Sequence, residues 1–414
     1  MKILLVNKYH YVRGGSETYY FGLAQLLRKA GHQVIFFSMQ DPKNLPCEQS
    51  QYFVSNVEFN GNLSIKQKVA AARHLVYSME AKKKFSALLK AEKPDIVHLN
   101  LFHRVLTASI VDAAKKYHVP VVFTMHDLNC LCPNHTMLDH GKICEACLAG
   151  NYVNCVRRIC FKDSRAKCIM AALESTYNKV SGLYNKIDLY ITPSEFYRKK
   201  VLESGLTKNE IICLRNFLPD YSFKTKKTAT DSYYLYFGRL SEEKGILTLL
   251  KAIKKVPNAN LEIAGTGPME TELHNYVREN GLETRVRFNG FLSGDPLLRI
   301  VANAKCIVLP SEWYENGPYS VMEAMAAGKP VIVSGEGGLP EIVHDGKDGY
   351  ISEAFNSDSL ADCIRKMERL DDIEYGQMSS YAAKQAVQMF DPERYLKKLV
   401  IEYQRLITKN AEAK

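Results

Sequence analysis

The chain has 414 residues, of which 46% are hydrophobic and 24% are charged, the proportions of a soluble globular protein. This length is sufficient for two domains of ordinary size. No apolar run reaches about eighteen residues, which argues against a membrane-spanning helix, and the opening MKILLVNKYH is typical of a first strand rather than a signal peptide. We therefore expect a cytoplasmic protein.

The net charge of +10 is concentrated in the first half of the chain. Residues 1–200 hold 28 Lys and Arg against 15 Asp and Glu, whereas the rest holds 27 against 30. The densest basic points are Lys82–Lys84, Lys115–Lys116, Arg157–Arg158 and Arg198–Lys200. Such residues either form solvated helix faces or meet an anionic surface such as the inner face of the cell membrane, where each adds about 1 kcal/mol. No recognisable nucleic-acid module accompanies them, so we expect no nucleic-acid partner.

Short apolar runs alternate with helical patterns along the chain. Strands are predicted at 2–6, 33–38, 95–100, 119–127 and 187–195, with a helix from Ser16 to Lys29. This rhythm predicts a parallel sheet covered on both faces. After a polar linker at 216–231 it restarts, with strands predicted at 233–240, 259–265, 286–291, 304–311 and 329–334.

These patterns predict an α/β protein with two tandem Rossmann-like, doubly wound domains facing a cleft. The first domain is expected at 1–215, with a cysteine-rich insertion at about 128–168, and the second at 216–388. A strongly amphipathic pattern at 390–407 predicts a final helix within 389–414. Ligands of such sheets bind beyond the carboxyl ends of the strands.

Glycine-bearing loops follow several of the predicted strands. Gly14 and Gly15 in RGGSE let the backbone approach a phosphate beside a helix N-terminus, or they form a simple turn. Arg239 and Lys244 in FGRLSEEKG can bracket a diphosphate with a planar fork and a point charge, or they are ordinary surface cations. Gly265 in IAGTGPME opens a further loop of this kind. Several such loops at strand ends are more specific together than any one alone.

Two glutamates frame the segment SEWYENGPYSVMEAMAAGKP. Glu315 lies before a glycine–proline turn, and Glu323 lies in a helix expected at about 318–327, because Pro318 suits its first turn and Gly328 its end. Carboxylates are acceptors for polyol hydroxyls, which favours a sugar on Glu315 and a ribose on Glu323. The plainer alternatives are a cap for Glu315 and a surface helix residue for Glu323. The chain has no Asp-x-Asp, so fixed cations and helix dipoles rather than a catalytic metal are expected to stabilise a leaving group.

Seven of the eleven cysteines fall between positions 130 and 168. Cys144 and Cys147, followed by Cys155 and Cys160, have a spacing compatible with a tetrahedral structural zinc site. Reduced buried thiols and a redox or disulfide role are the two other interpretations.

The order and spacing of RGGSE, MHD at 125–127, GRLSEEKG, AGTGP, the Glu-x7-Glu pair and GGLPEIV resemble retaining glycosyltransferases of family 4, with the GT-B fold. The resemblance covers nearly the whole chain. It implies that the final helix crosses back to the first domain. It also implies transfer of a sugar from a nucleotide-diphosphate donor to a hydroxyl acceptor with retention of anomeric configuration, by front-face attack.

The resemblance also implies roles for individual residues. Arg239 and Lys244 would hold the diphosphate with Gly15 behind it, Glu323 the ribose, and Glu315 and His126 the sugar, although a lone histidine at a strand end is otherwise more often structural. The remaining substrate-binding positions that it implies are Gly14, Gly265, Asn316, Gly317 and Tyr319. The basic first domain favours an acceptor at a membrane, such as a lipid-linked saccharide of a surface polysaccharide. The alternatives are a nucleotide-sugar epimerase on the same fold and an inactive zinc-bearing partner protein.

Overall fold

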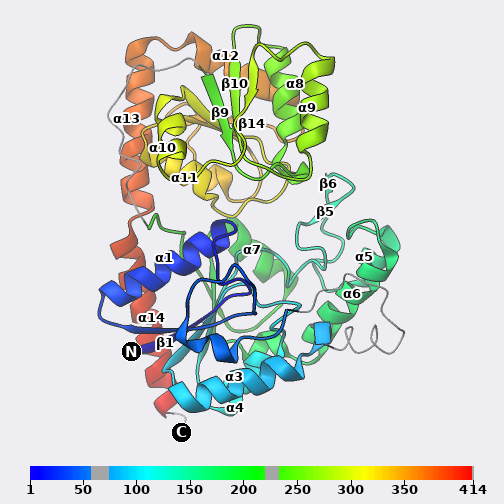
Figure 1. Ribbon diagram of the computed structural model, residues 1–414, viewed down its shortest axis with the longest axis vertical. Coiled ribbons are helices and arrows are strands. Elements are labelled where there is room, and N and C mark those ends of the chain that lie inside the picture. Colours follow the sequence, from blue (N-terminus) through cyan, green and yellow to red (C-terminus); the bar gives the residue numbers. More distant parts are fainter. Residues whose placement is uncertain (57–73, 220–232, 413–414) are drawn as a thin grey trace. The chain divides into compact units, whose positions relative to one another are not determined.

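The computed structural model describes residues 1–56, 74–219 and 233–412, which divide into two compact units (Figure 1). The first unit comprises Met1–His140, Cys144–Pro219 and Pro392–Lys414, and the second comprises Gly141–Ile143 and Asp220–Asp391. Most of the predicted linker, residues 220–231, lies outside the described residues. The units thus end at 219 and 391, where the sequence had suggested 215 and 388.

The first unit contains a six-stranded parallel sheet with the strand order β2-β1-β3-β4-β7-β8. Its strands are β1 (Lys2–Val6), β2 (Gln33–Phe37), β3 (Ile96–Leu99), β4 (Val121–Thr124), β7 (Leu189–Thr192) and β8 (Glu210–Cys213). The four inner strands are almost continuously apolar and buried, as expected of a sheet covered on both faces. Its main helices are α1 (Gly15–Lys29), α3 (Met79–Glu92), α4 (Ser109–Lys116) and α7 (Glu195–Ser204).

The cysteine-rich insertion lies between β4 and β7. It holds the short strands β5 (Leu138–Asp139) and β6 (Lys142–Ile143), and the helices α5 (Val153–Arg158) and α6 (Arg165–Val180). Ser164 caps α6, because its side chain accepts a hydrogen bond from the amide of Lys167. A small apolar cluster, formed by Cys147, Tyr152, Cys155, Cys168 and Ala172, joins α5 to α6.

The second unit contains a six-stranded parallel sheet with the order β11-β10-β9-β12-β13-β14. Its strands are β9 (Tyr233–Phe237), β10 (Asn260–Ala264), β11 (Val286–Phe288), β12 (Cys306–Leu309), β13 (Val331–Ser334) and β14 (Gly349–Ser352). Its helices are α8 (Ile246–Lys254), α9 (Glu270–Glu279), α10 (Gly294–Asn303), α11 (Tyr319–Ala326), α12 (Ser357–Arg369) and α13 (Asp372–Met389). Both sheets are of the Rossmann type, which confirms the predicted fold class.

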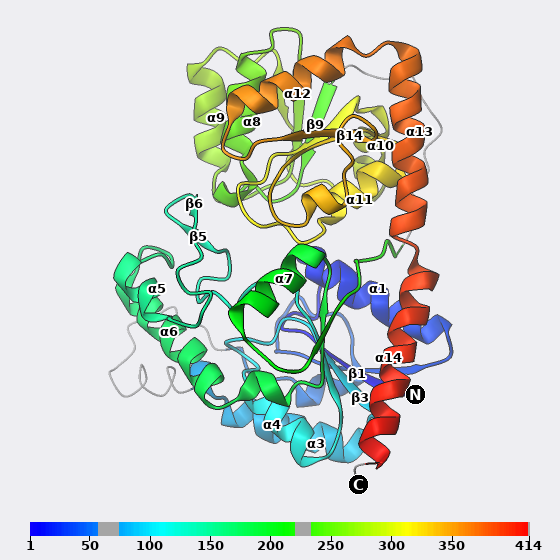
Figure 2. The same ribbon diagram turned by 180° about the vertical axis from the view of Figure 1, so that it is seen from behind.

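The final helix, α14 (Pro392–Glu412), packs within the first unit beside α1 (Figure 2). Buried polar contacts fix it there. The Tyr403 hydroxyl bonds Nδ1 of His98 in β3, and His98 Nε2 lies 2.7 Å from Oγ1 of Thr124 in β4. The Tyr19 hydroxyl joins the network, 3.3 Å from Thr124 Oγ1 and in contact with the hydroxyl of Tyr395. The helix therefore returns to the first unit, as the resemblance implied.

Candidate functional site

The loops after β9 and β10 are in direct backbone contact at the carboxyl ends of these strands. The amide of Gly238 donates to the Ala264 carbonyl at 3.0 Å, and the amide of Leu240 donates to the Thr266 carbonyl at 3.0 Å. Gly265 has a φ of +153°, and a Cβ there would lie 1.8 Å from the Gly238 carbonyl oxygen. No other residue type fits at Gly265 without moving one of the two loops.

The loops after β12 and β13 meet in the same way. Gly337 has a φ of +68°, and a Cβ there would lie 2.4 Å from the carbonyl oxygen of Glu315. The next amide, from Gly338, donates to that carbonyl at 2.7 Å. Gly245 at the start of α8 also has a φ of +68°, and its Cβ would lie 2.0 Å from the Pro310 carbonyl. The predicted loops therefore come together at one edge of this sheet.

Lys244 and Glu315 form an ion pair at this edge. The Lys244 Nζ donates to Oε1 of Glu315 at 2.5 Å, and the Ser311 hydroxyl donates to the same oxygen at 2.7 Å. Lys244 also lies 4.9 Å from the ring centre of Trp313, the only tryptophan of the chain. Burial raises the pKa of Glu315, but the Lys244 charge and these hydrogen bonds outweigh it, so the pKa is lowered and the carboxylate is ionised.

Glu323 is in the opposite electrostatic state. It is half-buried on α11, and among the described residues its carboxyl group has no cationic or hydrogen-bonding partner. Burial alone raises its pKa to about 8, so the group is protonated at neutral pH. Arg239 is exposed on the loop after β9, where the Tyr236 hydroxyl donates to its carbonyl at 2.7 Å.

The turn between the two glutamates differs slightly from the sequence-based prediction. Pro318 has an extended conformation, with a φ of −69° and a ψ of 133°, and is the N-cap rather than the first helical residue. Helix α11 begins at the buried Tyr319, and Asn316 and Gly317 precede the cap, with Gly317 at a φ of +84°. Asn316 and Gly317 therefore directly follow the buried Glu315 in the turn that leads into α11.

His126 lies two residues beyond β4, in the first unit. Its Nε2 is 2.8 Å from Oδ1 of Asn100, whose amide nitrogen donates to the Val6 carbonyl at 3.1 Å. Because Asn100 is oriented by Val6, its oxygen faces the imidazole, and His126 donates from Nε2 and keeps Nδ1 as an acceptor. Burial lowers the pKa of His126 to about 3, so the ring is neutral. The ring of Tyr19 packs edge-on against the imidazole, with 4.8 Å between the ring centres.

Gly14 and Gly15 form the start of α1, with Gly14 as the N-cap and Gly15 as the first helical residue. The same turn holds Glu17, which the sequence interpretation missed although it lies in RGGSE. Glu17 is 2% exposed and accepts hydrogen bonds from Asn7 Nδ2 at 3.1 Å and from the Ser16 hydroxyl at 3.0 Å. Burial raises the pKa of Glu17, although the hydrogen bonds from Asn7 and Ser16 oppose this shift.

The cysteines of the insertion lie near one another as thiols. All eleven cysteines are free, and Cys155 hydrogen-bonds the sulfur of Cys160, which lowers the pKa of the Cys160 thiol. Within the described residues, no group of three or more His, Cys, Asp or Glu side chains is placed to hold a metal ion. The zinc site expected at Cys144, Cys147, Cys155 and Cys160 therefore has no support from geometry and stays a prediction.

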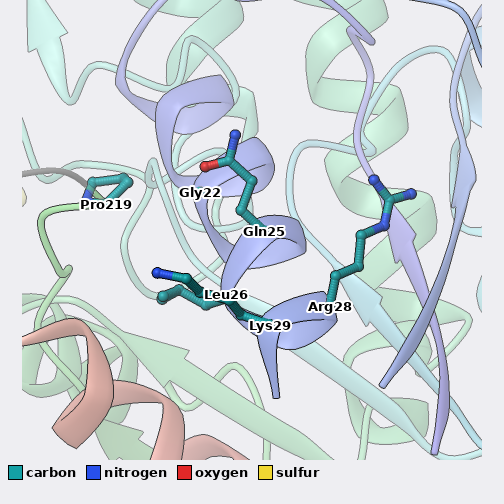
Figure 3. Close-up of a pocket in the computed structure, with 6 residues that line it drawn as sticks. All are labelled: Gly22, Gln25, Leu26, Arg28, Lys29 and Pro219. Carbon is teal, nitrogen blue, oxygen red and sulfur yellow. The ribbon is translucent and has the colours of Figure 1, made fainter. Parts of the chain in front are cut away.

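The pocket in Figure 3 lies elsewhere on the first unit. It is lined by Gly22, Gln25, Leu26, Arg28, Lys29 and Pro219. A Cβ at Gly22 would lie 2.5 Å from Cγ of Pro219. The absence of a side chain at Gly22 therefore lets the segment that ends at Pro219 pass close over α1. The pocket adjoins the second half of α1, whereas Gly14 and Gly15 are at its start. We therefore interpret this pocket as a consequence of the packing of Pro219 on α1 and not as a binding site.

Two family models match the chain. Residues 13–219 match the model described as Glycosyltransferase Family 4, and residues 219–385 match the model described as Glycosyl transferases group 1. The matched ranges together include the paired Lys244 and Glu315, Glu323, His126 and the Gly14–Gly15 turn.

Individual proteins agree with these matches. The chain is 29% identical over 373 residues to an uncharacterized glycosyltransferase of Methanocaldococcus jannaschii, covering 87% of each chain. It is 25% identical over 354 residues to an uncharacterized 42.6 kDa protein in the cps region of Klebsiella pneumoniae, covering 83% of this chain and 87% of that one. Among solved structures, HepE of Anabaena in complex with UDP superposes with a TM-score of 0.69, 20% identity and coverage of 98% of this chain and 100% of that one.

Proposed function

This chain belongs to the group 1 glycosyltransferases, and we propose that it moves a hexose from a nucleotide-diphosphate donor to a hydroxyl acceptor with retention of anomeric configuration. The observation that carries the donor assignment is the Lys244–Glu315 ion pair at the edge where four glycine-bearing loops meet. A cation and an anion held together there are suited to the two chemically different parts of a sugar diphosphate. HepE, a protein of the same fold, binds UDP.

In the proposed reaction, the bond between the sugar C1 and the diphosphate oxygen breaks while a bond between C1 and the acceptor oxygen forms on the same face. The acceptor proton passes to the departing phosphate oxygen, so no protein nucleophile is needed. Arg239 and Lys244 stabilise the negative charge that develops on the diphosphate. Arg239 supplies a planar fork from an exposed loop, and Lys244 supplies a point charge.

Donor binding would exchange the partners of the ion pair. In the free protein Glu315 is 4% exposed, and its charge is balanced by Lys244 at 2.5 Å. A diphosphate would take over Lys244, while the hydroxyls of the sugar would donate to Glu315. The buried carboxylate therefore keeps polar partners before and after binding, which avoids the cost of an isolated buried charge.

Glu323 is assigned to the ribose. Its carboxyl group is protonated in the free protein because burial raises its pKa to about 8. Two ribose hydroxyls would supply the hydrogen bonds that it lacks, which would stabilise the carboxylate and release the proton. His126 is assigned to the sugar as a neutral hydrogen-bonding residue, since Nε2 donates to Asn100 and Nδ1 can accept from a hydroxyl.

The acceptor is proposed to be a lipid-linked saccharide in surface polysaccharide assembly, met at the inner face of the cell membrane. The relative from the cps region of Klebsiella pneumoniae supports a role in polysaccharide synthesis. The positive charge of the first 200 residues supports an anionic surface nearby. The roles of Gly14, Gly15, Gly265, Asn316, Gly317 and Tyr319 in donor binding are part of the same proposal.

A thermal-shift screen with UDP, GDP and their hexose conjugates tests the donor assignment. We expect one nucleotide, at about 100 times its Kd, to stabilise the native protein by about 2.7 kcal/mol. The shift should be lost in Arg239→Ala and kept in Arg278→Ala, an exposed arginine on α9 of the same unit. No shift with any nucleotide, or an equal shift in both variants, would refute the assignment. Incubation of the matching labelled donor without acceptor then separates transfer from epimerisation, because only an epimerase forms product.

A further inference from the structure

Helix α6 exposes apolar side chains on the face that points away from its unit. Ile169, Leu173, Tyr177 and Val180, called here the α6 stripe, are 43%, 53%, 37% and 81% exposed. They are spaced four, four and three residues apart, which places them within about 80° of arc at 3.6 residues per turn. The outer face of a surface helix is normally polar, so this stripe needs an explanation.

The opposite face of α6 accounts for its packing. Its buried residues are Cys168, Ala171, Ala172, Glu174, Ser175 and Asn178. Two of them belong to the small apolar cluster that joins α6 to α5, and α6 also packs on the turn before β7. The α6 stripe is therefore not needed to hold the helix in place.

One aromatic contact joins the stripe to the segment before α3, and neighbouring elements expose further apolar side chains. The ring of Tyr177 lies 5.8 Å from that of Tyr77, which precedes the start of α3, and Met79 at that start is 67% exposed. On α5, which packs on α6, Val153 is 54% exposed. Figure 1 shows α5 and α6 at one side of the first unit, next to the start of α3.

The polar side chains around the stripe are mainly cationic. Helix α6 carries the exposed cations Arg165 and Lys167, while Lys179 donates to the Ala149 carbonyl at 3.0 Å. Its one carboxylate, Glu174, is 4% exposed and lies 3.7 Å from Nε of Arg104. Asp163 just before the helix is exposed and lies 3.6 Å from Nε2 of His140. Excess positive charge therefore borders the stripe.

Each of the densest basic clusters of this unit has at least one cation paired with a carboxylate, which distinguishes it from α6. Lys84 pairs with Glu80, Lys115 with Asp188, Arg158 with Asp139, Arg198 with Glu195 and Lys200 with Glu145. At least one cation of each of these clusters is thus balanced locally by a carboxylate. At α6, in contrast, Arg165 and Lys167 have no carboxylate partner among the described residues, and they share the helix with the exposed apolar side chains.

We propose that the exposed face of α6 binds the surface of an anionic phospholipid membrane, with the α6 stripe in the headgroup region and Arg165 and Lys167 against the lipid phosphates. This combination of an apolar stripe and flanking cations is what interfacial helices use to lie on a membrane. In the described part of the chain no helix is long and apolar enough to cross a bilayer. Binding at this face does not depend on the sugar-transfer reaction and can be measured without a donor.

Vesicle sedimentation with the full chain tests this. Vesicles of phosphatidylcholine with phosphatidylglycerol should retain the protein, whereas phosphatidylcholine alone and high salt should release it. The double variant Leu173→Ser/Val180→Ser should weaken retention at least tenfold. The matched control is Ile373→Ser/Val387→Ser on α13, two residues that are 71% and 50% exposed, and it should bind as the native protein does. Unchanged thermal unfolding of both variants shows that the fold is kept.

The charge component is tested separately with Arg165→Gln/Lys167→Gln, which keeps the apolar stripe. This variant should need less salt for release than the native protein. Absence of retention on anionic vesicles, or equal loss in the α6 and α13 variants, would overturn the proposal. So would light scattering that shows a dimer of the native chain dispersed by Leu173→Ser/Val180→Ser, because the stripe would then be covered by a second copy.

Discussion

Replacement of Glu323 by Gln is expected to stabilise the protein at neutral and alkaline pH while altering nucleotide binding. In the native fold this carboxyl group has a pKa of about 8 against an ordinary value of 4.5, so folding at pH 7 requires it to take up a proton. At 1.36 kcal/mol per pH unit, the 2.5 units between 4.5 and 7 correspond to about 3.4 kcal/mol. The side chain is partly exposed, and halving this figure for solvent screening leaves about 1.7 kcal/mol.

The direction of the effect with pH identifies its cause. Below about pH 4.5 the group is protonated in both the folded and the unfolded chain, and Glu323→Gln should change little. As the pH rises from 4.5 to about 8, the unfolded chain ionises first, so this group lowers the stability of the native protein and not that of the variant. At pH 7 we expect a Tm about 3–6 °C higher for the variant.

Calorimetry of the native protein, Glu323→Gln and the exposed control Glu272→Gln at several pH values measures this difference. A variant that is equally or less stable than the native protein at pH 8 would refute the reasoning about burial. UDP binding provides the second readout. In the native protein the Kd should fall about tenfold between pH 6.5 and 8 as the proton becomes easier to remove, whereas Glu323→Gln should retain only the pH dependence of the ligand itself.

Three further substitutions test the rest of the structure by urea unfolding. Lys244→Ala leaves the buried Glu315 without its cation and should cost about 3–5 kcal/mol at pH 7, most of which Lys244→Ala/Glu315→Gln should restore. Gly337→Ala should cost about 1–3 kcal/mol, because the new Cβ meets the Glu315 carbonyl, and clearly more than Gly346→Ala, where φ is +76° but no atom lies within 4 Å. Tyr403→Phe leaves a buried histidine of β3 unsatisfied and should cost about 1–3 kcal/mol; no change would show that α14 is held by its apolar face alone.

The sequence predicted the inner strands of both sheets well, because a strand buried on both faces is an uninterrupted apolar run. It missed β8 and β14, which are the edge strands next to β7 and β13. Their sequences, EIIC and GYIS, are short and mix polar with apolar residues, as edge positions allow. Whether such a segment becomes a strand depends on the partner strand beside it, which a local pattern does not contain.

The candidate site was likewise predicted only in part from the sequence. Glycines at the ends of strands were visible in the sequence because only close backbone approach or a positive φ requires them there, as at Gly265 and Gly337. The residues that orient the proposed site were not visible. Ser311 beside Glu315, Trp313 beside Lys244 and Asn100 beside His126 have roles that arise only from tertiary contacts.

The spacing of the two glutamates in the sequence does not predict their charge states. Glu315 and Glu323 lie on one loop-and-helix segment, yet one is ionised because Lys244 and Ser311 offset its burial, and the other is neutral because no group does. Environments that push like carboxyl groups to opposite charge states are typical of functional sites. In the proposed function each state matches the ligand group assigned to it. The ionised Glu315 is held by a lysine that the diphosphate can take, and the neutral Glu323 becomes an acceptor only when hydroxyls arrive, so its proton release would report occupation of the ribose position.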